Sequence, residues 1–233
     1  MTNSEFTNVG LNERLNKLRA AVLGANDGIV STAAVVLGVA GATSDIRAIA
    51  TAGIAAVIGG AVSMALGEYV SVSSQRDTER AYIAKESALH TNDPDTEYAH
   101  LVDGFVAEGL TRETATQVAK ELTASNPLKA HLKLHYGIDE EDIVSPWSAA
   151  AASFISFFVG ALLPLAAVLL PPEAIRVPAT FVVTLIALAL TGGVSARIGG
   201  ADPKRAVARL VIGGALGLAV TFGIGWAFGS SGL

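Results

Sequence analysis

Long apolar stretches separated by short polar connections dominate the chain. A helix that crosses a bilayer needs roughly 20 mostly apolar residues. Five stretches meet that length: residues 20–43, 48–67, 148–170, 177–196 and 206 to the C-terminus. No segment alternates apolar and polar positions with the period of two that indicates a strand. The pattern therefore predicts an all-α, polytopic membrane protein with five transmembrane helices.

Residues 75–146 break this pattern, because they hold most of the charge and all four histidines. We interpret this segment as a helical insert between the second and third spans. We expect four helices in the insert. The first covers 76–90, the second begins at Asp93-Pro94, and the third is capped by Thr111. The fourth begins at Asn126-Pro127 and ends at Gly137. The predicted division is 1–74 for the N-terminal segment and helices one and two, 75–146 for the insert, and 147–233 for helices three to five.

Composition supports a membrane protein and removes several function classes. Charged residues make up 16% of the chain, against about 25% in soluble domains. Glycines, 24 in all, lie inside the apolar runs, as is common where membrane helices pack closely. The absence of cysteine excludes disulfides, thiolate metal sites and cysteine nucleophiles. The net charge of −5 without a basic stripe argues against nucleic acid as a partner.

Lys and Arg cluster in alternate loops between the spans, and this distribution predicts the orientation of the protein in the membrane. The N-terminal segment, the insert and the connection between spans four and five are rich in basic residues. The other two loops carry only Arg47 and Arg176, and the C-terminal tail has none. We expect the N-terminus and insert in the cytosol and the C-terminus outside. Residues 1–10 show no signal-peptide pattern, so a prokaryotic plasma membrane is the simplest expectation.

Asp27 is the one charged residue within the first apolar stretch. A carboxylate inside a membrane helix is costly, and usually faces a cavity or a partner. Alternatively, the span begins at Gly28 and Asp27 lies at the interface. In span two, Met64 and Glu68 are four residues apart and share a helix face. Met64 is either packing or a soft metal ligand, and Glu68 is either part of an ion path or an ordinary helix exit.

The insert carries three acid and imidazole pairs at helical spacing. Carboxylate and imidazole suit Fe2+, Mn2+, Co2+ and Zn2+, and helical bundles build metal sites from such pairs. The alternative is a solvated helical surface. The pairs are Glu86 with His90, Glu97 with His100, and His131 with His135.

Other function classes fit less well. An intramembrane enzyme needs a nucleophile or chelating cluster within its spans, and the spans contain no Cys, His or His-Glu-x-x-His motif. We therefore expect no enzymatic activity and no resident cofactor. A membrane-anchored metal sensor or storage protein could use the insert alone, and would bind metal without flux.

Two motifs resemble those of the vacuolar iron transporter family: NDGIVST at 26–32 and SMALGEYVSVSSQRD at 63–77. The similarity is continuous over about 70 residues, and the later PWSAAAASFISFFVGALLP fits in layout. The resemblance implies a homodimer with a cytosolic metal-binding insert. It implies export of Fe2+ and other divalent ions by proton antiport, with Asp27 and Met64 on the ion path.

The insert departs from the family pattern. Glu86 and Glu97 match two family glutamates, but Leu89 and His100 stand where a second glutamate is expected three residues later. The Met-Met-x-x-Glu motif of the last insert helix is absent, and His135 stands near its acidic position. The expectation is mixed Glu and His ligation of metal, reduced affinity, or loss of binding.

Overall fold

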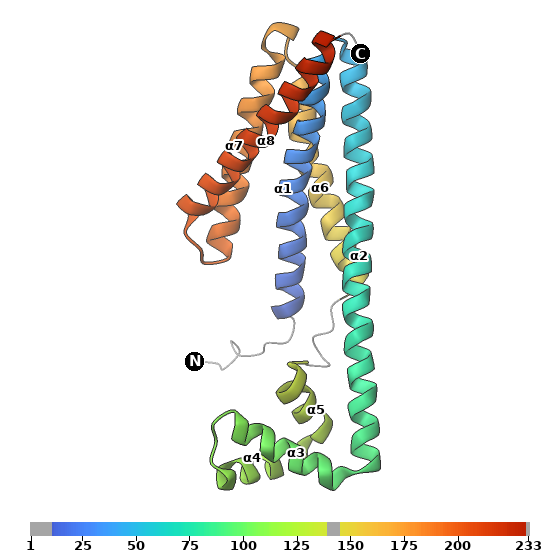
Figure 1. The fold of residues 1–233 in the computed structure, drawn as a ribbon, viewed down its shortest axis with the longest axis vertical. Coiled ribbons are helices and arrows are strands. Elements are labelled where there is room, and N and C mark those ends of the chain that lie inside the picture. Colours follow the sequence, from blue (N-terminus) through green and yellow to red (C-terminus); the bar gives the residue numbers. More distant parts are fainter. Residues whose placement is uncertain (1–10, 139–144, 232–233) are drawn as a thin grey trace, which may run out of the picture. The chain divides into compact units, whose positions relative to one another are not determined.

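The computed structural model describes residues 11–138 and 145–231 (Figure 1). Over these residues it is helical without any strand. The elements are α1 (Leu11–Ala42), α2 (Ile46–Asn92), α3 (Pro94–Ala107), α4 (Arg112–Ser125), α5 (Pro127–His131), the π-helical turn η1 (Leu132–Tyr136), α6 (Pro146–Leu169), α7 (Glu173–Ile198) and α8 (Pro203–Ser231).

Five helices are long and apolar enough to cross a membrane: α1 from Leu18, α2, α6, α7 and α8. The predicted fold class is thus confirmed. The described residues form two compact units, of which one contains 16–70 and 146–231, and the other contains 11–15, 71–138 and 145. Placement of the second unit in the cytosol stays a prediction, as do the division at 75 and 146 and the orientation of the termini.

Residues 76–90 are helical as expected, but they do not form a helix of their own, because α2 runs without a break from Ile46 to Asn92. No Gly or Pro occurs between Glu68 and Asn92, so nothing in this stretch ends a helix. The first stop is Asp93-Pro94, where Asp93 accepts a hydrogen bond from the Thr96 backbone N–H and caps α3.

In the membrane unit, α1 packs against three other helices and approaches two of them, α6 and α8, through glycines. Gly24 lies so close to α6 that a Cβ there would be 2.8 Å from the Ser153 carbonyl oxygen. On the α7 side, Ile29 is buried against Leu188. Toward the C-terminal end of α1, Gly41 meets the Phe222 backbone of α8. Such glycines let backbones approach closely where lipid supplies no hydrophobic drive between helices.

The second unit has its own apolar core, in which Leu101 of α3 packs with Ala115 and Ala119 of α4. Thr111 and Asn126 cap the next two helices as expected, each accepting a hydrogen bond from a backbone N–H three residues on. The helix expected to run from Pro127 to Gly137 changes register, because α5 gives way to the π-turn η1 at Leu132.

Candidate metal centre

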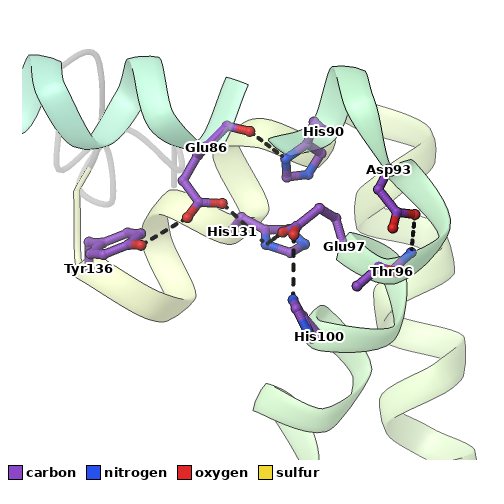
Figure 2. A network of polar contacts seen from close by, with 8 residues as sticks. All are labelled: Glu86, His90, Asp93, Thr96, Glu97, His100, His131 and Tyr136. Carbon is purple, nitrogen blue, oxygen red and sulfur yellow. Dashed lines mark hydrogen bonds and ion pairs between the residues drawn. The ribbon is translucent and has the colours of Figure 1, made fainter. Parts of the chain in front are cut away.

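Four ligand-type side chains from α2, α3 and α5 converge in the second unit (Figure 2). One potential donor atom from each lies within 4.8 Å of the others. Three of the residues are almost fully buried, with relative exposures of 1–5%. The set is Glu86, His90, Glu97 and His131.

The buried imidazole of His131 is the centre of this group. Its Nδ1 lies 3.4 Å from Glu97 Oε2 and 3.8 Å from Glu86 Oε2. Neither His131 Nδ1 nor Glu86 Oε2 has a hydrogen bond within the described residues, although both are buried. Because buried polar atoms are normally paired, these two atoms are expected to meet a species that the protein itself does not supply.

His90 is oriented by its own helix. Its Nδ1 lies 3.0 Å from the Glu86 carbonyl oxygen. That oxygen can only accept, so Nδ1 carries the proton and the lone pair is on Nε2. The His90 and His131 rings meet edge to face, with centroids 4.4 Å apart. A metal-binding histidine commonly has its second nitrogen fixed by such a backbone contact.

Burial lowers the pKa of His131, and the neighbouring His90 ring adds to that effect. The negative charge of Glu97 raises the pKa of His131, but this effect is smaller. At neutral pH the imidazole is therefore uncharged, which is the form that binds a metal.

Sequence reasoning missed Tyr136, whose hydroxyl donates a 2.8 Å hydrogen bond to Glu86 Oε1. This bond is the main cause that raises the pKa of Tyr136, so the phenol stays protonated at neutral pH. Tyr136 follows His131 by five residues, which would place it on a different side of an α-helix. The π-turn η1 lies between them, and Figure 2 shows both residues reaching Glu86. No signal in the sequence marks that turn.

The other two predicted insert residues lie outside the four-residue group. His100 borders it, with Nδ1 3.4 Å from Glu97 Oε1 and a side chain that is 58% exposed. His135 is exposed, and its ring centroid is 5.3 Å from that of His131. The acidic run at 139–142, whose composition favours a solvated linker into the third span, lies outside the described residues.

In the membrane unit, Asp27 is half-buried on α1. No hydrogen bond or ion pair to its carboxylate occurs among the residues that the structure describes. Its neighbours fix the helix, because Asn26 Oδ1 accepts a 2.6 Å hydrogen bond from Thr191 Oγ1 of α7. On the next residue, Gly28 abuts the Phe157 backbone of α6. The carboxylate is thus held on a well-anchored stretch of α1.

Met64 is half-buried on α2 and packs against the cluster of Val57, Ala61, Phe157 and Ala161. Its cluster therefore includes the same Phe157 whose backbone meets Gly28. The packing interpretation of Met64 is compatible with this contact, and a ligand role stays a prediction.

Glu68 is buried, and its Oε1 lies 2.9 Å from an Arg19 guanidinium nitrogen. Sequence reasoning did not pair these residues. A buried carboxylate held by an arginine differs from an exposed helix exit, since removal of Arg19, whose side chain is 57% exposed, would take this partner away from the buried charge of Glu68.

Comparison with known proteins supplies the family. The sequence model of the VIT family matches residues 18–226. A vacuolar iron transporter of Acanthamoeba castellanii is 39% identical over 90% of this chain and 77% of the relative. The vacuolar iron transporter homolog 5 of Oryza sativa subsp. japonica is 36% identical over 94% of this chain and 84% of the relative. The vacuolar iron transporter homolog 2 of Arabidopsis thaliana is 34% identical over 98% of this chain and 93% of the relative. With the family match extending over all five candidate spans, the chain belongs to the VIT family.

Proposed function

We propose that this protein exports a divalent transition-metal ion, first of all Fe2+, from the cytosol in exchange for protons. Membership of the VIT family makes the chain an integral membrane transporter of metal ions rather than an enzyme. Iron as the main cargo is supported by its relatives, which are named vacuolar iron transporters, and Fe2+ is the divalent form of iron that carboxylate and imidazole donors bind. Mn2+, Co2+ and Zn2+ are further cargo, because carboxylate, imidazole and thioether donors accept them.

The observation that carries the proposal is the Asp27 carboxylate, which is half-buried in a membrane-spanning helix without a protein partner among the described residues. Intramembrane acids of this kind mark ion paths and proton relays. Metal and proton compete for one carboxylate. Protonation of Asp27 from the outside would therefore release the ion, which couples export to proton entry.

The remaining residues receive roles in the same proposal. The cluster of Glu86, His90, Glu97 and His131 collects ions on the cytosolic side, with His100 and His135 at its edge. Glu68 lies at the cytosolic mouth of the path and Met64 supplies a soft ligand beside Asp27. The protein acts as a homodimer in a prokaryotic plasma membrane, with the N-terminus and insert in the cytosol and the C-terminus outside.

The test is Fe2+ flux in proteoliposomes, comparing wild type with Asp27→Asn. The matched control is Asp45→Asn, because Asp45 is exposed before α2 and its Oδ1 accepts a backbone hydrogen bond that Asn can also accept. We expect Asp27→Asn to abolish flux and Asp45→Asn to retain it. Equal flux in all three proteins would refute the role of Asp27. Absence of flux from the wild type, together with metal binding, would instead identify a membrane-anchored sensor or storage protein.

A further inference from the structure

Each carboxylate of the metal centre has its two oxygens in different surroundings. Glu86 Oε2 is buried 3.8 Å from His131 Nδ1, whereas Oε1 accepts the hydrogen bond from Tyr136. Glu97 repeats the arrangement, because its Oε2 lies 3.4 Å from His131 Nδ1 and its Oε1 lies 3.4 Å from His100 Nδ1. Figure 2 shows the oxygens of Glu86 directed to two different neighbours.

We propose that Tyr136 is a positioning residue that makes Glu86 a one-oxygen ligand and thereby adapts the centre to an ion with four ligands, such as Zn2+ or Co2+. The inference rests on the metal-binding role proposed above. With Oε1 held by the phenol, Glu86 presents Oε2 alone. Glu97 Oε1 lies 3.4 Å from His100 Nδ1 while Oε2 faces His131, so each of the four residues presents one donor atom to the centre.

The distances from His131 Nδ1 to the two carboxylates are close to those of four-coordination. Ligand bonds of about 2.0–2.2 Å in a tetrahedral site place the donor atoms about 3.4 Å apart. His131 Nδ1 lies 3.4 Å from Glu97 Oε2 and 3.8 Å from Glu86 Oε2, and the four donor atoms lie within 4.8 Å of one another. An octahedral ion needs six donors with neighbours only about 3 Å apart, so it would need two water ligands besides these four residues. Mn2+, which prefers octahedral oxygen sites, should therefore bind here more weakly than Zn2+ or Co2+.

Two features show that this arrangement is built for a ligand. His131 Nδ1 and Glu86 Oε2 are buried beside each other without hydrogen bonds. The π-turn η1 places the Tyr136 hydroxyl on Glu86 instead of on the surface, and irregular turns of this type are frequent at functional sites. Tyr82 stacks on Tyr136 with ring centroids 4.6 Å apart, which holds the phenol in place.

The test is Co2+ titration of the full chain in detergent, read by visible absorption, with Tyr136→Phe and the control Tyr98→Phe. Tyr98 donates its hydroxyl hydrogen bond to the Thr116 carbonyl, away from the centre. We expect one Co2+ in the insert of each wild-type chain, recognised by the intense d–d band of four-coordination, and the same for Tyr98→Phe. Tyr136→Phe should bind about 10–100-fold more weakly, with a weaker band and a smaller preference for Zn2+ over Mn2+. An unchanged spectrum and affinity in Tyr136→Phe would overturn the inference.

Infrared spectroscopy gives a second measurement that needs no variant. On addition of Zn2+ to the wild type, the separation of the carboxylate stretches should be the wide one of one-oxygen ligation. A narrow, two-oxygen separation would overturn the inference. Transport by the wild type is measured separately. If the wild type transports Fe2+ but the Tyr136→Phe spectrum is unaltered, only the role of Tyr136 is refuted. If Tyr136→Phe changes the spectrum but the wild type shows no flux, only the transport proposal is refuted.

Discussion

Replacing Gly28 by Ala should push α1 away from α6. A Cβ at this position would lie 2.9 Å from the Phe157 carbonyl carbon and 3.0 Å from Phe157 Cα, and would also clash with the carbonyl oxygen. Carbon atoms normally pack at about 3.5–4.0 Å, so the helices must separate by roughly 0.5–1 Å. The neighbouring atoms are backbone and cannot rotate away.

Overpacking of this kind costs about 1–3 kcal/mol, and the better helix propensity of Ala returns at most about 1 kcal/mol. We expect a net destabilisation of about 1–2 kcal/mol in thermal unfolding of the detergent-solubilised protein, together with reduced Fe2+ flux because Asp27 is the preceding residue. Gly213→Ala is the control, since a Cβ there meets nothing within 4 Å among the described residues. It should be neutral or stabilising. Identical melting of the two variants would refute the close-packing argument.

Two further predictions concern His131. Since burial lowers its folded-state pKa below the ordinary 6.5, the unfolded state binds more protons as the pH falls below about 6.5, and stability decreases there. The protection factors of the amides in 127–136, which are exchange rates corrected for the intrinsic rate at each pH, should therefore decrease between pH 7 and pH 5, and protection that stays constant over this range would contradict the reasoning. His131→Ala should abolish Co2+ binding by the insert whereas His135→Ala, at an exposed position, should retain it; equal loss in both variants would show that His135 is also a ligand.

The membrane helices were predictable because their signal is local. Apolar length alone located all five spans, and the cap residues Asp93, Thr111 and Asn126 marked the helix starts of the insert. The continuity of α2 through 76–90 was missed, because a change from apolar to charged composition does not interrupt backbone hydrogen bonding. The composition of a helix indicates whether lipid or water surrounds it, whereas residues such as Pro or Gly indicate where it ends.

The candidate metal centre was predictable in part. Spacings of three and four residues identified each acid and imidazole pair, but spacing within one helix cannot show which pair members face another helix. The structure turns His131 inward and leaves His135 exposed. Tyr136 joins the centre through a π-turn, which changes the angular relation of residues five apart. Pairing of Arg19 with Glu68 is a long-range contact that no local pattern encodes.

The central claim is that metal export is driven by proton entry. The most direct measurement records Fe2+ movement and lumenal pH simultaneously in proteoliposomes that contain the wild-type protein, at several imposed pH gradients. Proton-driven export predicts an initial Fe2+ rate that rises with the gradient, opposite proton movement that begins only when Fe2+ is added, and loss of the gradient effect with an uncoupler. A rate independent of the gradient, with no proton movement linked to Fe2+, would contradict it.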